Sequence, residues 1–176
     1  MDLQGTYEGG IMEMDLRGYS LRELLLGAIK SEIESREIYT KLSGVVRNAF
    51  LKNRLVFLAA EEGKHREFLE GLFREMFNEG PAAIPERSLA PLPEIKVPGR
   101  YTTASEVVLA AMNAEKASSD FYGSLADLLK GEDAKKTVQY LSLMEMGHYR
   151  LLELEKEQLD KEEEYQFEWE MMHAGP

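Results

Sequence analysis

Apolar residues recur at the three- and four-residue spacing of an α-helix in four separate segments of the chain. We predict helices over residues 20–43, 48–78, 103–130 and 133–160. The first and third segments open with capping-box patterns, Ser20-x-x-Glu23 and Thr103-x-x-Glu106, whose side chains satisfy free backbone N–H groups at a helix start. Short turns join the first helix to the second and the third to the fourth, so each pair should form an antiparallel hairpin.

The stretch between the second and third predicted helices has a different composition. Residues 79–102 hold five of the six prolines and show no helical period. Such a long connection is unusual in a compact domain, but some four-helix bundles need one between their second and third helices. We therefore predict an all-α fold, a four-helix bundle over residues 20–160 in which a long crossover joins two hairpins. Residues 1–19 would form an N-terminal extension, and residues 161–176 an acidic and aromatic tail.

The two predicted hairpins repeat one pattern of polar residues at an offset of 83 positions. Each repeated polar residue falls on the stripe of its helix that should face the bundle interior. The matched pairs are Glu32 and Glu115, Tyr39 and Tyr122, Glu62 and Glu145, and His65 and His148. The chain is therefore interpreted as two copies of one helical hairpin that pack about a pseudo-twofold axis.

Four glutamates and two histidines thus occupy positions that the bundle should bury. Carboxylates buried without partners are strongly destabilising unless they retain a proton. Residues three apart on a helix are neighbours, so each Glu-x-x-His motif can direct two ligand atoms at one place. Two divalent cations would balance four carboxylates, and a mixture of oxygen and imidazole ligands suits iron or manganese. The sequence therefore predicts a site for two metal ions in the bundle core.

Some of these residues also have a plainer interpretation. Glu-x-x-His is a short motif, and a third copy, Glu170-x-x-His173, has neither an offset partner nor an apolar stripe around it. We interpret that copy as part of an ordinary chain end. Tyr39 and Tyr122 would pack well in a bundle core whether or not they touch a metal ligand. Other acidic residues are expected on solvated helix faces, namely Glu34, Glu37, Glu61 and Glu153.

Composition narrows the possible partners and chemistry. The net charge of -11 makes nucleic acid or an anionic membrane surface an unsuitable partner. The absence of cysteine excludes disulfides, thiolate catalysis and cysteine-bound iron within these 176 residues. The first residues lack the basic and apolar regions of a secretion signal, and no apolar run is long enough to span a bilayer. We therefore expect a cytoplasmic protein.

The joint ligand pattern matches the one described for ferritin-like di-iron and di-manganese bundles, with one Glu from each of two helices and Glu-x-x-His from each of the others. Among these proteins the sequence resembles most the rubrerythrin-like family. The resemblance lies within about residues 20–160 and is carried by AIKSEIESREIYTKL, LAAEEGKHREFLEGL, AAMNAEKASSDFYGSLADLL and LSLMEMGHYRLLELE. It implies a ferritin-like four-helix bundle.

The resemblance also implies a role for each site residue and a cofactor of two iron ions per chain, with manganese or a mixed pair as alternatives. The expected metal ligands are Glu32, Glu62, His65, Glu115, Glu145 and His148. Of these, Glu62 and Glu145 would bridge the two ions, and the other two glutamates would each bind one. Tyr39 and Tyr122 match family tyrosines that resemble hydrogen-bond donors to ligand carboxylates across the bundle.

Members of the family reduce peroxide or dioxygen, or oxidise ferrous iron, so the resemblance implies a di-iron oxidoreductase. Rubrerythrins proper add a small domain whose cysteine-bound iron supplies electrons, and they carry a further glutamate where this chain has Ser118. Because the chain has no cysteine, we expect the electrons to come from a separate donor. The other expected partner is a small-molecule oxidant, peroxide or dioxygen, and the expected assembly is a homodimer. Two alternatives stay open: a ferritin-like protein that oxidises and stores iron, and a metal-free helical scaffold.

Overall fold

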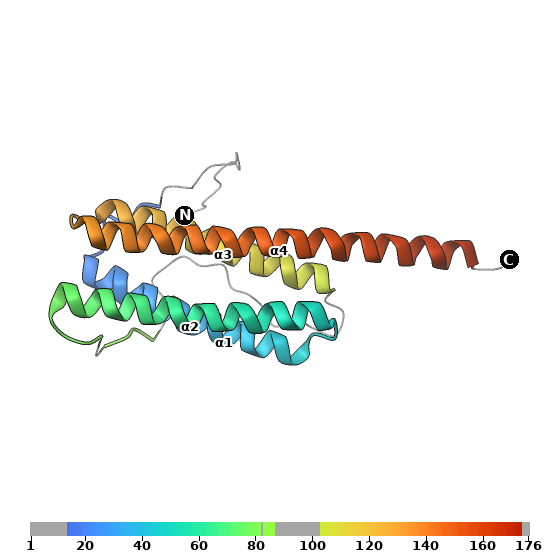
Figure 1. Cartoon of the computed structure of the whole chain (residues 1–176), viewed down its shortest axis with the longest axis horizontal. Helices are drawn as coiled ribbons and strands as arrows, with labels where there is room; N and C mark the ends of the chain where they lie inside the picture. The colour runs from blue at the N-terminus through green and yellow to red at the C-terminus, as the bar shows by residue number, and fades with distance from the viewer. Residues whose placement is uncertain (1–13, 82, 87–102, 174–176) are drawn as a thin grey trace.

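The structure is a computed structural model that describes residues 14–81, 83–86 and 103–173. The helices are α1 Leu21–Val45, α2 Ala49–Phe77, α3 Ala104–Leu128 and α4 Glu132–His173. They form two antiparallel hairpins, α1 with α2 and α3 with α4, that lie side by side (Figure 1). The described residues contain no strand, and the predicted all-α four-helix bundle is confirmed. None of the helices described is both long and apolar enough to cross a membrane.

The helix starts follow the predicted capping patterns. The Ser20 hydroxyl accepts a hydrogen bond from the backbone N–H of Glu23, and the Glu23 carboxylate accepts one from the backbone N–H of Ser20. Thr103 and Glu106 make the same reciprocal pair at the start of α3. At the start of α2, the Asn48 side chain accepts from a backbone N–H, although the sequence shows no capping box there. Side-chain caps therefore fix the start of each of these three helices.

Two apolar clusters fill the bundle, one on each side of a polar layer. The first cluster includes Leu25, Ile29, Leu69, Phe73, Leu125, Val138 and Leu141. The second includes Leu42, Leu55, Leu58, Val108, Ala111 and Leu152. On every helix the predicted metal ligands fall between residues of the first cluster and residues of the second. The apolar packing therefore holds the four helices together on both sides of the ligand layer and separates that layer from the bundle ends.

A reciprocal pair of serines fixes α3 against α4 close to the polar layer. The Ser119 hydroxyl donates a 2.9 Å hydrogen bond to the backbone carbonyl oxygen of Ser142. The Ser142 hydroxyl donates a 2.8 Å hydrogen bond to the backbone carbonyl oxygen of Ser119. Both serines are buried, and both small side chains allow the two helices to approach closely. These bonds set the register of the second hairpin.

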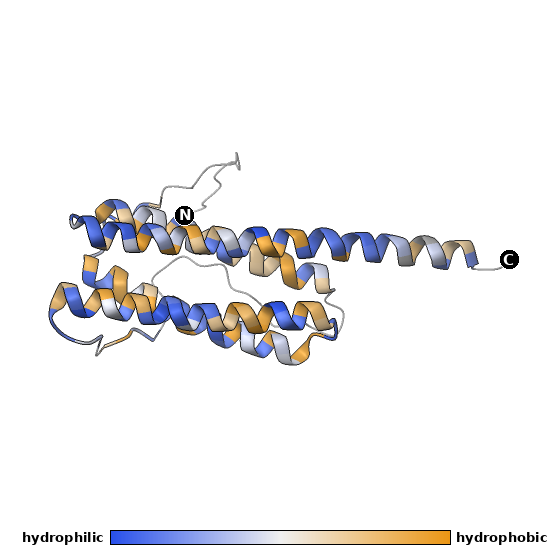
Figure 2. Cartoon of the chain, viewed as in Figure 1, coloured by the Kyte–Doolittle hydropathy of each residue, from blue (hydrophilic) through white to orange (hydrophobic). Residues whose placement is uncertain are grey.

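Helix α4 is longer than the sequence pattern predicts. It continues to His173, whereas the predicted helix ends at residue 160, and it projects beyond the other helices (Figure 1). The reason is local, because residues 161–173 contain neither glycine nor proline and are rich in the strong helix formers Glu, Gln and Met. Most of this projecting part is hydrophilic (Figure 2). The predicted tail from residue 161 is therefore helical over most of its length.

Two other predicted segments lie partly or mainly outside the described residues. The predicted crossover is described only at 79–81 and 83–86. The predicted N-terminal extension is described only from residue 14 onward, where Leu16 is buried against the first apolar cluster.

Candidate metal centre

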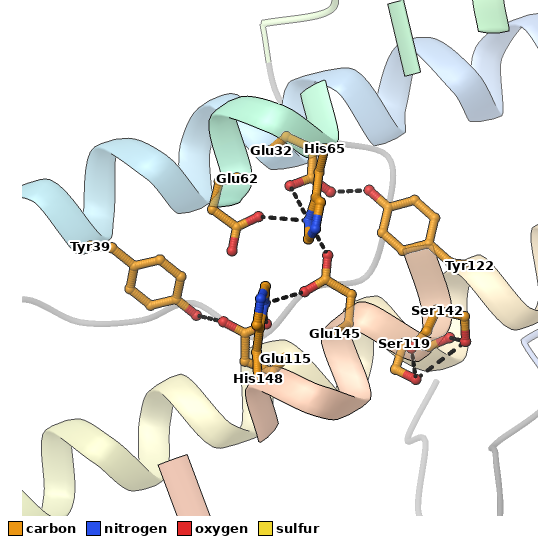
Figure 3. Close-up of polar contacts among 10 residues, drawn as sticks. All are labelled: Glu32, Tyr39, Glu62, His65, Glu115, Ser119, Tyr122, Ser142, Glu145 and His148. Carbon is orange, nitrogen blue, oxygen red and sulfur yellow. Dashed lines mark hydrogen bonds and ion pairs between the residues drawn. The ribbon is translucent and has the colours of Figure 1, made fainter. Parts of the chain in front are cut away.

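All six predicted ligand residues meet in one layer at the middle of the bundle. One glutamate comes from each of α1 and α3, and one Glu-x-x-His motif comes from each of α2 and α4 (Figure 3). The six residues are Glu32, Glu62, His65, Glu115, Glu145 and His148, and none is more than 3% exposed. The helical repeat brings them together because each lies on the inward stripe of its helix.

The six residues form two groups of four that have two members in common. One group consists of Glu32, Glu62, His65 and Glu145, and the other of Glu62, Glu115, Glu145 and His148. Within each group, one ligand-type atom per residue lies within 4.8 Å of the corresponding atoms of the others. Glu62 and Glu145 belong to both groups, which is the arrangement needed for two carboxylates to bridge a pair of ions.

The Nδ1 atoms of both histidines face the carboxylates. His65 Nδ1 lies 2.8 Å from Glu145 Oε1 and 3.8 Å from Glu32 Oε2. His148 Nδ1 lies 3.4 Å from Glu115 Oε2 and 3.3 Å from Glu145 Oε2. The imidazole rings themselves stack, with centroids 5.4 Å apart and an interplanar angle of 18°. The Glu145 carboxylate therefore approaches Nδ1 of both rings, with a different oxygen for each.

Several polar atoms of this layer are buried and have no hydrogen-bond partner among the described residues. They are Glu32 Oε2, Glu145 Oε1, His65 Nδ1, His65 Nε2 and His148 Nε2. The 2.8 Å contact between His65 and Glu145 is short, but its direction is unsuitable for a hydrogen bond. Native proteins rarely bury unpaired polar atoms, and four of these five atoms belong to residues of one four-residue group, the one that contains Glu32 and His65. A cation would supply the partner that these oxygens and Nδ1 lack.

Two buried tyrosines fix the outer glutamates from opposite sides. Tyr39 of α1 donates a 2.6 Å hydrogen bond to Glu115 Oε1 of α3, and Tyr122 of α3 donates to Glu32 Oε1 of α1. In both cases the second oxygen of the carboxylate faces a histidine. Each tyrosine thus holds one oxygen in place and leaves the other oxygen directed into the layer (Figure 3).

Burial and crowding change the protonation of these groups. Burial raises the pKa of Glu32, Glu62 and Glu145 well above the ordinary 4.5, and neighbouring carboxylates add to the effect. Burial also acts to raise the pKa of Glu115, but hydrogen bonds with His148 and Glu145 outweigh it and lower that pKa. For His148, burial acts to lower the pKa, but the carboxylates of Glu115 and Glu145 outweigh it and raise the pKa to about 9. The cluster therefore retains protons that a bound cation would displace.

Comparison with known proteins agrees with this geometry. The family model described as Rubrerythrin matches residues 23–156, which include all six ligand-type residues. The chain belongs to the rubrerythrin family. A solved structure of a hypothetical protein from Pyrococcus furiosus is 33% identical, with a TM-score of 0.72, over 84% of this chain and 94% of that chain. Among curated proteins, none matches the chain.

One carboxylate near the rubrerythrin centre contradicts the prediction made for it. Glu61 was expected on a solvated face, but only 8% of it is exposed. Its carboxylate and a ring nitrogen from each of His65 and His148 lie within 4.8 Å of one another. One feature of the sequence indicates that Glu61 is buried: it lies four residues before His65, which places the two side chains on the same helix face. At the corresponding place in the second hairpin the chain has Met144.

The third Glu-x-x-His motif lies apart from the rubrerythrin centre. Glu170 and His173 are exposed on the projecting end of α4. The His173 ring stacks on Trp169 with a centroid distance of 3.8 Å, and its Nδ1 lies 2.8 Å from the Trp169 carbonyl oxygen. The position of this motif distinguishes it from the two copies in the bundle core.

Proposed function

We propose that this protein is a di-iron oxidoreductase that reduces peroxide or dioxygen. The observation that carries the proposal is the pair of four-residue groups that share Glu62 and Glu145. Membership of the rubrerythrin family supports iron as the metal, because the ligand pattern is the one used by carboxylate-bound di-iron bundles. The role of the chain itself would be to hold two ions in a buried layer of closely spaced carboxylates and imidazoles.

The residues fit a pair of iron ions in number, charge and type. Four carboxylates balance two divalent cations, and the two imidazoles complete a ligand set of oxygen and nitrogen that suits iron. Glu62 and Glu145 would bridge the ions, because each belongs to both groups. The remaining ligands divide between the ions, with Glu32 and His65 on one side and Glu115 and His148 on the other.

When bound and reduced, two irons supply the two electrons that, with two protons, convert hydrogen peroxide to two molecules of water. The chain holds the ligands in position for this reaction. Tyr39 and Tyr122 each restrain one carboxylate oxygen, and the apolar clusters on both sides exclude bulk water. The chain has no cysteine for an electron-transfer iron site, so the electrons for further turnover would come from a donor outside these 176 residues.

Metal binding is tested by loading the protein with ferrous iron without oxygen and measuring iron by elemental analysis. We expect about two irons per chain, as the two four-residue groups imply. Glu62→Ala and His148→Ala should lower the iron content. Glu170→Ala is the matched control, because it removes the glutamate of the third Glu-x-x-His motif, on the projecting part of α4. Unchanged iron content in the first two variants would refute the proposal.

Activity is tested by adding peroxide to the reduced, iron-loaded protein without oxygen. We expect about one peroxide consumed per loaded chain, since each reduction takes two electrons, and a new absorbance of ferric iron that disappears when a reductant is added. Iron uptake far beyond two ions per chain, together with a large cage on size-exclusion chromatography, would instead indicate an iron-storage protein. A protein that isolates with manganese and disproportionates peroxide without a reductant would contradict the reductase proposal as well.

A further inference from the structure

The buried carboxylate of Glu61 is not needed to complete either group of metal ligands. It is the residue before Glu62 on α2, yet it is close to the two histidines of the centre and belongs to neither four-residue group. One of its oxygens lies 2.5 Å from Lys64 Nζ, and the Lys64 side chain is 62% exposed. Glu61 therefore lies close both to the two histidines of the centre and to the ammonium group of the exposed Lys64.

The histidines require hydrogen-bond acceptors on the side of the ring away from the metals. In both rings Nδ1 faces the carboxylate layer, so a ring that binds a metal through Nδ1 carries its proton on Nε2. The Nε2 atoms of His65 and His148 are buried and have no hydrogen-bond partner among the described residues. A buried N–H without an acceptor is costly, and metal-bound histidines almost always donate this proton to a carboxylate, a carbonyl or water.

Glu61 is the carboxylate placed to accept these protons. The two rings stack nearly parallel, with Nδ1 of each facing the carboxylate layer, and a ring nitrogen of each lies within 4.8 Å of a Glu61 oxygen. On another side of the His148 ring, Phe57 packs edge-on at a centroid distance of 6.0 Å and offers no acceptor. Lys64 Nζ donates a 2.5 Å hydrogen bond to Glu61 Oε1, a charge-assisted contact that restrains the carboxylate.

We propose that Glu61 is a positioning residue that accepts the Nε2–H of His65 and His148 and so directs Nδ1 of both rings at the metals. The corresponding residue of the second hairpin, Met144, has no oxygen to accept a hydrogen bond. A single carboxylate therefore serves both histidines, and the two halves of an otherwise repeated centre differ at this point. This inference rests on the proposed function only in requiring metal at the six ligand residues.

The test uses zinc-loaded protein labelled with ¹⁵N at histidine, because Zn²⁺ is diamagnetic and the chain has only three histidines. In the wild-type protein we expect one downfield Nε2–H proton signal from each of the two core histidines, with slow solvent exchange. In Glu61→Met, which copies the residue at Met144, both signals should move upfield and exchange faster. Glu61→Gln keeps an accepting oxygen and should preserve them in part. Glu67→Met, an exposed site on the same helix, is the matched control.

Metal affinity gives a second readout, measured by competition with a chelator. We expect Glu61→Met to bind zinc and ferrous iron about 10- to 100-fold more weakly, with the number of ions per chain unchanged. Unchanged histidine signals in a metal-loaded Glu61→Met protein would overturn this inference and leave the proposed function intact. Loss of one ion per chain would make Glu61 a direct ligand and overturn it too. A wild-type chain that binds neither metal would refute both proposals.

Discussion

At the scale of single residues, the two tyrosines give the sharpest test of how the layer is organised. Tyr39→Phe removes the 2.6 Å hydrogen bond to Glu115 Oε1 and leaves an aromatic ring of nearly the same shape. The freed carboxylate should bind its metal less well, so we expect metal affinity to fall about 10-fold in a chelator competition assay. Tyr165→Phe, on the exposed part of α4, is the control. Equal affinity in the Tyr39 variant and the control would show that the tyrosine only packs.

The sequence alone places the six ligand-type residues in the bundle core, because each position is constrained in two ways. Helical spacing puts Glu32 on the inward stripe of its helix, and the offset of 83 residues puts Glu115 at the equivalent position of the third helix. Two independent patterns therefore predict that both glutamates are buried. Glu61 has no such support, because its counterpart is Met144 and its one sequence signal is the four-residue spacing to His65. That spacing puts the two side chains on one helix face, but whether the edge of that face is buried depends on the packing of whole helices.

At the scale of the helices, the ends show what a local pattern can and cannot predict. The start of α3 at Thr103 follows from a capping box, which is a local interaction of a few residues. The end of α4 has no such local signal, because the apolar stripe ends before residue 161 while the helix-forming composition continues. Amphipathic periodicity marks the part of a helix that packs, so it predicts the bundle and misses the projecting end.

The projecting end of α4 should be dispensable for metal binding. A chain that stops after Asp160 keeps the 2.6 Å hydrogen bond from the Ser105 hydroxyl of α3 to the Asp160 carboxylate of α4. We expect the truncated protein to bind the same number of ions with the same affinity, and to lose helical signal in far-ultraviolet circular dichroism. Loss of metal binding, with the bundle still folded, would mean that residues 161–176 contribute to the centre.

At the scale of the whole molecule, the bundle buries a charged layer between two apolar clusters. The clusters stabilise the fold through burial of apolar surface, whereas the layer between them opposes folding unless its charges are neutralised. A bound cation that interacts with the folded chain and not with the unfolded one adds to stability by mass action. Metal binding at these six residues would therefore be coupled to folding, and the same buried layer determines how stability depends on pH.

Without metal, the protein should become less stable as the pH rises. The pKa values of Glu32, Glu62 and Glu145 are raised above 4.5, and that of His148 is raised from 6.5 to about 9. The folded chain therefore holds these protons more tightly than the unfolded chain does, so their contribution is complete below the unfolded pKa values and is lost as pH rises through the folded ones. Glu115, whose pKa is lowered, acts in the opposite direction, but only below its ordinary 4.5.

Metal should reverse this trend, because its ligands must lose protons before they bind, so binding strengthens as pH rises. Thermal melts between about pH 5.5 and pH 8.5 measure both effects, with Mn²⁺ as a divalent ion that resists oxidation in this range. The melting temperature of the metal-free protein should fall across this range, and the increase caused by Mn²⁺ should grow. Glu145→Gln removes one titrating carboxylate and should flatten the metal-free curve. A Mn²⁺ increment that does not change with pH would show that the buried layer does not bind the ion.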